Sequence, residues 1–554
     1  MVPLLRAAAF AAGIDLTLYV SEFNAHVQEM LDPASPLYRF APDAAILAVQ
    51  TRDVVPGLWR GFSTSAEQSQ AVGRVTAEFR HWAGVFRSHS QAHLVVHNLE
   101  QPVLPGGGVL DDQRVDNQTH AIQQINRELR QMAAEHTGVY VLDYDALVAR
   151  YGRANWHDEG KWLTVRLPVA AHNLHHLVNE WLRFLHPLTG KVAKALVVDL
   201  DNTLWGGVIG EDGMAGIRLG TEYPGAAFQE VQRAMLSLYQ RGILLAICSK
   251  NNREDAMEAL QNHPGMLVKQ THFAAMRINW GEKAQNLLDI AAELNIGVDS
   301  LVFLDDNPFE RQQVRAQVPE VFVIELPHDP MGFARALREC PRFERLALST
   351  EDQQRGHYYQ IQREREQLEQ TVSSREDFYR SLGQEIEIAP VDKSSLPRVA
   401  QLTNKTNQFN LTTHRYTEQQ LSELASSPNW HCFSLSVRDR FGDNGLVGVA
   451  ITHEEDTICE IDTLLLSCRV IGRTVETAFL SFLADHARRH GSFKLRGWFL
   501  PTRKNAPAGE FYPNHGFQVV EKSGEGTLWA LDLEEDRVAC PEWIRLDIVE
   551  GDRE

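Results

Sequence analysis

The stretch Ala195-Leu-Val-Val-Asp-Leu-Asp-Asn-Thr-Leu-Trp205 decides how the rest of the chain is organised. Its apolar residues Leu196 to Val198 predict a buried strand. If the strand continues, the alternation of side chains places Asp199 and Asp201 on the same side. Two carboxylates held this close repel each other unless a cation lies between them, and Mg2+ is a hard cation suited to oxygen ligands. The alternative is a strand that runs into an ordinary polar turn, because Asp, Asn and Thr are common turn residues.

Two further apolar runs end in polar residues in the same way. The run 243–248 is followed by Ser-Lys-Asn-Asn, and the run 301–304 is followed by Asp305 and Asp306. Lys283 begins an amphipathic helical pattern between these two runs. Open parallel α/β sheets place their sites at the carboxyl ends of strands that are separated by helices. We therefore expect one site that contains two aspartate pairs, a hydroxyl group and a lysine.

This ordered set of residues resembles the haloacid dehalogenase-like phosphotransferase superfamily. The resemblance implies that Asp199 is the nucleophile that becomes an aspartyl-phosphate, and that Asp201 is the general acid and base. It implies that Lys283 offsets the charge of the phosphate, because phosphoryl transfer depends on positioning and charge neutralisation. The remaining implied ligands are Thr203, Ser249, Lys250 and Asn251 for the substrate, and Asp199, Asp201, Asp305 and Asp306 for Mg2+.

The residues around these motifs narrow the resemblance to the FkbH-like family, the glyceryl transferases/phosphatases of polyketide assembly lines. The similar stretches are Asp199-Leu-Asp-Asn-Thr-Leu-Trp-Gly-Gly-Val, Cys248-Ser-Lys-Asn-Asn, Arg277-Ile-Asn-Trp and Thr406-Asn-Gln-Phe-Asn-Leu-Thr-Thr. The resemblance implies that 1,3-bisphosphoglycerate is captured as a cysteine thioester and dephosphorylated. The glyceryl group then passes to the phosphopantetheine thiol of an acyl carrier protein. Two other classes of function remain open: a simple Mg2+-dependent phosphatase, and a non-catalytic assembly-line scaffold.

Cys248 separates the transferase from the simple phosphatase, because hydrolysis of a phosphate ester needs no thiol. Cys248 precedes the phosphate-binding Ser249, and Asn251-Asn252-Arg253 predicts a helix N-terminus that would favour the thiolate. Lys250 adds positive charge nearby. We therefore predict that Cys248 accepts the acyl group. The alternative is that Cys248 is a small hydrophobic residue at the end of a buried strand.

Composition limits the broad class of the protein. A chain of 554 residues is too long for one core, and about three or four domains are expected. The 44% of hydrophobic and 23% of charged residues are typical of globular proteins, and the net charge of −19 argues against nucleic acid as a partner. Six scattered cysteines favour a reducing, cytoplasmic location over a disulfide framework. No apolar run is long enough to predict a membrane span.

We predict a multidomain α/β chain with a boundary near residue 190. Residues 1–190 form an α/β pattern that resembles an SGNH-hydrolase-like domain. The pattern opens on a helix where such a fold opens on a strand, so we expect its first strand to be missing or the start to be truncated. There is no Gly-Asp-Ser nucleophile block, and His157-Asp158 has the wrong order for the Asp-x-x-His pair. We therefore expect a non-catalytic domain here, followed at 191–345 by the Rossmann-like haloacid dehalogenase-type domain and at 346–374 by a charged linker helix.

Residues 375–545 predict an α+β domain that is similar to the Gcn5-related N-acetyltransferases (GNAT). Arg469 and Gly472 match that fold's pyrophosphate-binding turn, but Thr474 departs from its final small residue. A structural domain without coenzyme A chemistry is one alternative, and a groove for the carrier's phosphopantetheine arm is another. Because carrier proteins of this type are acidic, we expect basic groups to dock the carrier. The expected carrier-binding residues are Arg415, Arg469, Gly472 and Arg473.

Overall fold

The computed structural model describes residues 1–59, 64–347, 365, 368, 372, 374–406, 408–467, 469–502 and 504–549. Most of the predicted linker helix at 346–374 lies outside these residues. The chain divides into two compact units, Met1–Leu238 with Val298–Ser349, and Tyr239–Gly297 with Thr350–Glu554. No described helix combines the length and the apolar character that crossing a membrane requires.

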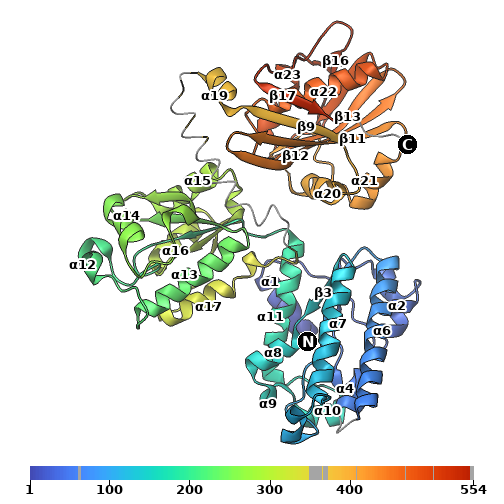
Figure 1. The fold of residues 1–554 in the computed structure, drawn as a ribbon, viewed down its shortest axis with the longest axis vertical. Coiled ribbons are helices and arrows are strands. Elements are labelled where there is room, and N and C mark those ends of the chain that lie inside the picture. The colour runs from blue at the N-terminus through green and yellow to red at the C-terminus, as the bar shows by residue number, and fades with distance from the viewer. Residues whose placement is uncertain are drawn as a thin grey trace. The chain divides into compact units, whose positions relative to one another are not determined.

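The N-terminal part of the first unit is a parallel sheet of the order β1-β2-β3 with helices on both faces (Figure 1). The strands are β1 (Ala44–Leu47), β2 (His93–His97) and β3 (Val139–Leu142). Alternation along β2 sends Leu94 and Val96 into a core with α6 (Ser65–His89) and α7 (Gln118–Glu135), and sends Val95 into a second core with α8 (Tyr144–Tyr151). Two further helices, α1 (Val2–Ala11) and α11 (Leu174–Leu185), pack together through Leu5 and Val178.

The same unit contains three further parallel strands. The two aspartate pairs follow two of these strands. Strand β7 (Leu301–Leu304) pairs with β4 (Ala195–Val198) on one side and with β8 (Phe322–Val323) on the other. Every residue of β4 and β7 is fully buried, as the continuous apolar runs predicted. Helix α13 (Gly225–Gln240) begins in this unit, and α16 (Pro308–Gln317) follows β7.

In the second unit, β5 (Leu244–Ser249) pairs in parallel with β6 (Phe273–Ile278). Helix α14 (Arg253–Asn262) follows β5, and α15 (Lys283–Glu293) follows β6. The predicted strand at 243–248 is thus confirmed with a shift of one residue. The helix start predicted at 251–253 is also confirmed, because Asn252 is the residue that precedes α14.

The C-terminal part of the second unit is a mixed nine-stranded sheet among the described residues, in the order β15-β16-β14-β13-β12-β11-β9-β17, with β10 beside β13. The strands are β9 (Gln384–Pro390), β10 (Phe409–Asn410), β11 (Trp430–Asp439), β12 (Gly442–Glu455), β13 (Ile458–Leu466), β14 (Lys494–Phe499), β15 (Gln518–Lys522), β16 (Thr527–Asp532) and β17 (Ile544–Ile548). Neighbours are antiparallel except β13 with β14 and β17 with β9, and α22 (Val475–Arg489) connects β13 to β14.

Helices cover both faces of this mixed sheet. Helix α22 packs on one face through residues such as Phe479 and Leu483, and α20 (Leu396–Lys405) and α21 (Glu418–Ala425) pack on the other through Val399 and Leu421. The α+β pattern predicted for this segment is therefore present.

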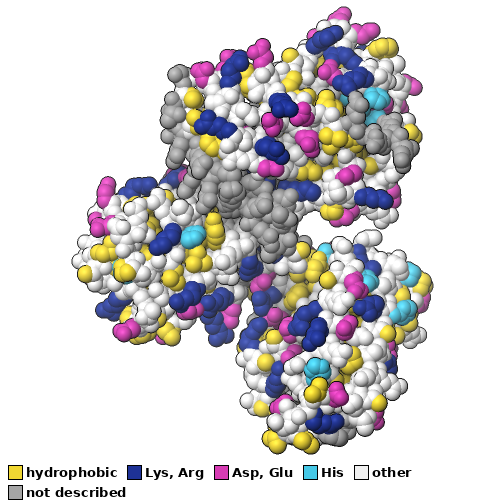
Figure 2. All heavy atoms as spheres, in the orientation of Figure 1, with side chains coloured by type: hydrophobic (Ala, Val, Ile, Leu, Met, Phe, Trp, Pro, Cys, Tyr) yellow, Lys and Arg dark blue, Asp and Glu magenta, His cyan; other side chains and the backbone are white. Residues whose placement is uncertain are grey.

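On the face drawn in Figure 2, the coloured Lys and Arg side chains are interspersed with Asp and Glu side chains. Proteins that bind a nucleic acid backbone instead present a continuous basic stripe.

Candidate functional site

Three aspartates of the first unit converge at the carboxyl ends of two paired strands. Val198 is the register partner of Leu304, so Asp199 and Asp305 are the next residues on neighbouring strands. One carboxylate oxygen from each of Asp199, Asp305 and Asp306 lies within 4.8 Å of the others, and Asp199 and Asp305 are buried. Buried like charges at this spacing need a counter-charge, and the oxygen donor set suits a hard divalent cation. The residues present therefore fit Mg2+.

The backbone around this group is held by specific hydrogen bonds. The Arg311 guanidinium of α16 donates through Nη1 to the carbonyl oxygens of Asp305 (2.8 Å) and Asp306 (2.7 Å). Asp305 Oδ1 accepts from the Asn307 amide at 2.8 Å. These bonds fix the turn after β7, so that both carboxylates leave the strand end in a defined direction.

Thr203 has a different position from the one we predicted. Its side chain is fully buried, and its hydroxyl donates to Asp306 Oδ1 at 3.1 Å while accepting from the Asp306 amide at 3.0 Å. A hydroxyl engaged in this way orients a carboxylate. The prediction that Thr203 binds substrate directly is corrected to a positioning role.

Asp201 does not belong to the group of three carboxylates. Its Oδ1 accepts from the indole Nε1 of Trp205 at 2.9 Å and from the amide of Ile209 at 3.0 Å. Both donors belong to the segment that follows β4, and they fix the orientation of the Asp201 carboxylate. Three of the four predicted carboxylate ligands therefore form one group, and the assignment of Asp201 as a ligand stays a prediction.

The glycine-rich segment after Trp205 closes on itself as a flap. Gly206 and Arg218 exchange backbone hydrogen bonds of 3.0 and 2.7 Å, and α12 (Ile209–Gly216) lies between them. The segment is therefore a loop with a short helix at its tip. Gly207 has a φ of +94°, and a Cβ there would lie 2.6 Å from Asp212 Oδ2, so the turn requires glycine.

The predicted residues of the second unit gather around the end of β5. Cys248, Ser249, Asn251 and Lys283 are all buried. The Cys248 thiol contacts the Lys283 carbonyl oxygen at 3.8 Å, and Asn251 Nδ2 donates to Ser249 Oγ at 3.5 Å. Lys250 is half-buried, with its Nζ 3.9 Å from Glu282. The start of α15 is thus brought to the end of β5, as the order of the motifs predicts.

The predicted carrier-binding residues are mostly engaged inside the protein. Arg473 is buried, and its Nη1 lies 3.2 Å from Asp439 Oδ2. Arg469 donates to the carbonyl of Asn444 at 3.1 Å, and Arg415 donates to the carbonyls of Thr403 and Thr406.

Gly472 has a φ of +79°, and its carbonyl accepts from the Tyr379 hydroxyl at 3.2 Å. Together with the internal ion pair of Arg473, this makes the turn before α22 a packed structural feature. The prediction that Arg473 presents a free charge to a partner is therefore corrected, because its guanidinium is committed to Asp439.

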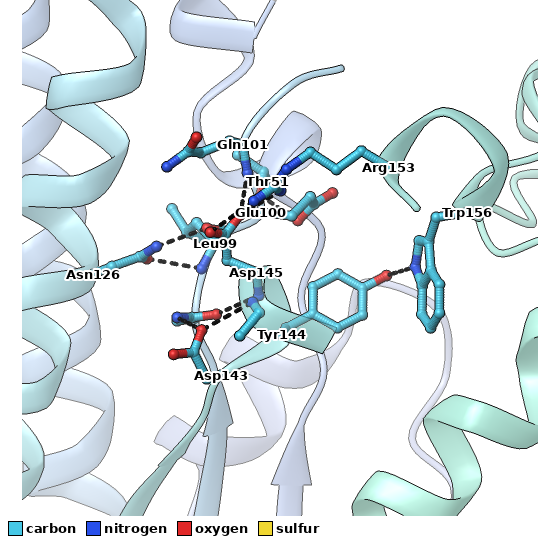
Figure 3. A network of polar contacts seen from close by, with 12 residues as sticks. Thr51, Leu99, Glu100, Gln101, Asn126, Asp143, Tyr144, Asp145, Arg153 and Trp156 are labelled. Atoms are coloured by element: carbon cyan, nitrogen blue, oxygen red, sulfur yellow. Dashed lines mark hydrogen bonds and ion pairs between the residues drawn. The ribbon is translucent and has the colours of Figure 1, made fainter. Parts of the chain in front are cut away.

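The N-terminal sheet carries a polar network after β2 and β3, drawn in Figure 3. The Asn126 amide pairs with the backbone of Leu99 through bonds of 2.8 and 2.7 Å. Asp145 accepts from the Gln101 amide at 2.8 Å and from Arg153. These bonds connect the loops after β2 and β3 to the helices α7 and α9 (Arg153–Trp156), and the expectation of a non-catalytic domain stays a prediction.

Comparisons with known proteins agree with the motifs. The family model described as FkbH, N-terminal domain, matches residues 3–185. The structure is similar to the N-terminal part of the protein BF1531 from Bacteroides fragilis, which contains a phosphatase domain complexed with Mg. That similarity has a TM-score of 0.56 and 29% sequence identity, and it covers 62% of this chain and 90% of the other. No curated protein matches the chain.

Two acetyltransferase structures also align with part of the chain. The ribosomal-protein-S18-alanine N-acetyltransferase from Escherichia coli is 14% identical, with a TM-score of 0.22 over 30% of this chain and 98% of the other. The PaiA N-acetyltransferase from Thermoplasma acidophilum, in complex with coenzyme A, is 15% identical, with a TM-score of 0.21 over 26% of this chain and 98% of the other. TM-scores this low establish no shared fold, and the SGNH-like and GNAT-like assignments stay predictions. The chain carries the FkbH N-terminal domain at residues 3–185, which confirms the FkbH-like resemblance.

Proposed function

We propose that this protein is a Mg2+-dependent phosphatase and glyceryl transferase of the haloacid dehalogenase superfamily. The observation that carries the proposal is the convergence of Asp199, Asp305 and Asp306 at the ends of two paired parallel strands. The similarity to a phosphatase domain complexed with Mg supports the phosphatase part. Asp199, Asp305 and Asp306 would hold the cation, which would offset the negative charge of the phosphoryl group.

The phosphatase chemistry assigns a role to each residue of the matched motifs. Asp199 attacks phosphorus and becomes the aspartyl-phosphate, and Asp201 protonates the leaving oxygen and then activates water. Trp205 and Ile209 donate to Asp201 Oδ1, which orients this carboxylate for proton exchange. Ser249, Lys250, Asn251 and Lys283 bind the phosphate, a role that rests on the motif resemblance.

The transferase chemistry acts on an acyl phosphate, of which 1,3-bisphosphoglycerate is the proposed example. The Cys248 thiolate attacks the acyl carbon, the C–O bond to phosphate breaks, and phosphate leaves with its electron pair. The phosphopantetheine thiol of an acyl carrier protein then displaces Cys248 from the thioester, and Cys248 recovers the thiolate.

Arg415, Arg469 and the turn at Gly472 are proposed to lie near the docked carrier, with Arg473 supporting that turn from inside. The five described cysteines are free thiols, which suits the reducing cytoplasm proposed as the location.

A simple Mg2+-dependent phosphatase is the second candidate function, and one observation favours it. The Cys248 side chain has no exposed surface, whereas a nucleophilic thiol must reach its substrate. A non-catalytic scaffold is the third class, and the presence of every acidic residue of the motif set argues against it.

Intact-mass analysis separates these three functions. The enzyme is incubated with Mg2+, 1,3-bisphosphoglycerate and a carrier protein bearing phosphopantetheine, with a carrier that lacks the arm as the control. A glyceryl mass without phosphate on the armed carrier alone supports the transferase. Phosphate release with an unmodified carrier supports the simple phosphatase, and neither event supports the scaffold.

A further inference from the structure

Three side chains of the C-terminal sheet and its covering helix form a second cluster of metal-ligating type. His431, Glu454 and His486 each place one ligand atom within 4.8 Å of the other two. His431 is buried, and Glu454 and His486 are partly exposed. The atoms His431 Nε2, Glu454 Oε1 and His486 Nε2 are buried, although the side chains of Glu454 and His486 are partly exposed.

Strand register explains why these residues meet. His431 of β11 is the antiparallel partner of Thr452 on β12, and Glu454 is two residues further along β12, so it points to the same face of the sheet. His453 points to the opposite face, where its ring centroid lies 4.7 Å from that of Trp430.

Helix α22 supplies the third side chain from above this face. The helix packs there with the rings of Phe433 and Phe482 4.9 Å apart, and His486 lies in its last turn. The ring centroids of His431 and His486 are 4.8 Å apart. The cluster therefore bridges two strands and the end of the helix that covers them.

The geometry and the chemistry of the cluster suit a borderline divalent metal. His431 Nε2 and Glu454 Oε1 are 3.5 Å apart, and Glu454 Oε1 accepts no hydrogen bond from any residue the structure describes. Tetrahedral bonds of about 2.0–2.2 Å separate neighbouring ligand atoms by roughly this distance. Two imidazole nitrogens and one carboxylate oxygen form a donor set that binds Zn2+ in preference to Mg2+.

His490 borders the cluster one helical turn beyond His486. Their ring centroids are 4.1 Å apart, and His490 Nδ1 lies 2.9 Å from the His486 carbonyl oxygen. A hydrogen bond from Nδ1 to this carbonyl fixes the ring of His490 beside the cluster, of which His490 is not a member.

We propose that His431, Glu454 and His486 form a Zn2+ site, distinct from the aspartate group, that fastens the C-terminal turn of α22 to strands β11 and β12. The aspartate group offers only hard oxygen ligands and prefers Mg2+. The two sites therefore differ in metal preference, and each can be tested while the other is occupied.

The test is a titration of the metal-free full-length protein with Co2+ in excess Mg2+, followed by the visible absorption of Co2+ and by competition with Zn2+. The wild-type protein should bind one equivalent at this site. His431→Ala, Glu454→Gln and His486→Ala should each weaken that binding by at least about tenfold, the size found when metal-site residues are altered. The matched control is His453→Ala, a neighbouring histidine on the other face of β12, which should bind like the wild type.

Stability supplies a second readout, because a ligand that binds only the folded state stabilises it. Zn2+ should raise the Tm of the wild type and of His453→Ala and leave that of Glu454→Gln unchanged. The conservative Glu454→Gln keeps the size of the side chain, so loss of binding in a variant with a normal circular dichroism spectrum is specific. Equal Co2+ binding by the wild type and all three variants would overturn the proposal, as would the absence of any Zn2+ effect on the wild-type Tm.

Discussion

Thr203 and Asp306 share two hydrogen bonds through one hydroxyl group. Thr203 Oγ1 donates to Asp306 Oδ1 at 3.1 Å and accepts from the Asp306 amide at 3.0 Å, although the residues are 103 positions apart in sequence. The bond pair joins the loop after β4 to the turn after β7. It therefore fixes one carboxylate of the proposed Mg2+ site relative to the loop that carries Asp201.

Thr203→Val tests this positioning, because valine keeps the shape and removes the hydroxyl. The partly buried amide of Asp306 loses its acceptor, which should lower the free energy of unfolding by about 1–3 kcal/mol. The Mg2+ concentration for half-maximal phosphate release should rise, as measured by a Mg2+ titration. Thr203→Ser keeps the hydroxyl and should resemble the wild type. An unchanged Mg2+ dependence in Thr203→Val would contradict the positioning role.

Trp205→Phe tests whether the Trp205 indole positions the Asp201 carboxylate. It removes the indole donor to Asp201 Oδ1, a hydrogen bond to a charged group worth about 1.5–3 kcal/mol. Phosphate release should slow by about one to two orders of magnitude, and the acidic limb of its pH–rate profile should shift. The control is Trp543→Phe, which loses a comparable 2.8 Å indole bond to Thr474 elsewhere in the chain. Equal rates and equal pH profiles for both variants would show that Trp205 does not position Asp201.

His97 should make the first unit acid-sensitive. Burial lowers the pKa of His97 from 6.5 to about 3, and its Nε2 accepts from the Trp181 indole at 2.8 Å. The unfolded chain binds a proton below pH 6.5 while the folded chain does not. The free energy of unfolding therefore decreases as the pH falls from 6.5 towards 3. The decrease is at most about 1.4 kcal/mol per pH unit.

Urea unfolding followed by tryptophan fluorescence between pH 7 and 4.5 measures this loss. His97→Gln retains an acceptor for Trp181 and cannot titrate, so its loss should be smaller than that of the wild type. The exposed His81→Gln is the control and should follow the wild type. Parallel pH profiles for His97→Gln and the wild type would rule out this origin of the acid sensitivity.

Cys248 decides between the two catalytic proposals. If it carries the acyl group, the wild type gains a glyceryl mass after exposure to 1,3-bisphosphoglycerate, and Cys248→Ala gains none and fails to load the carrier. Cys340→Ala is the control, because Cys340 is also a buried free thiol. Normal loading of the carrier by Cys248→Ala would show that the transfer is direct.

The parts of the site that follow from local sequence were predictable. The runs at 196–198 and 301–304 are β4 and β7, so the aspartates that follow them were placed at strand ends correctly. The partners of those aspartates were not predictable, because the bond from Thr203 to Asp306 depends on how distant strands pair. Arg473 was misplaced for the same reason, since it lies in the turn before α22 and its partner Asp439 lies at the end of β11.

The histidine cluster left no local signal in the sequence. His431 and Glu454 meet only through the register of β11 with β12, and His486 joins them only because α22 packs on that face.

Phosphate release is the measurement that tests the central claim, that Asp199, Asp305 and Asp306 form the Mg2+ site of a phosphatase. It is measured with 1,3-bisphosphoglycerate for the wild type, Asp199→Asn, Asp306→Asn and, as the control, the exposed Asp112→Asn. We predict Mg2+-dependent release of the ester phosphate by the wild type and the control, loss of that release in excess chelator, no release of the ester phosphate by Asp199→Asn, and a raised Mg2+ requirement for Asp306→Asn. Release by Asp199→Asn at the wild-type rate, or full release in excess chelator, would contradict the account.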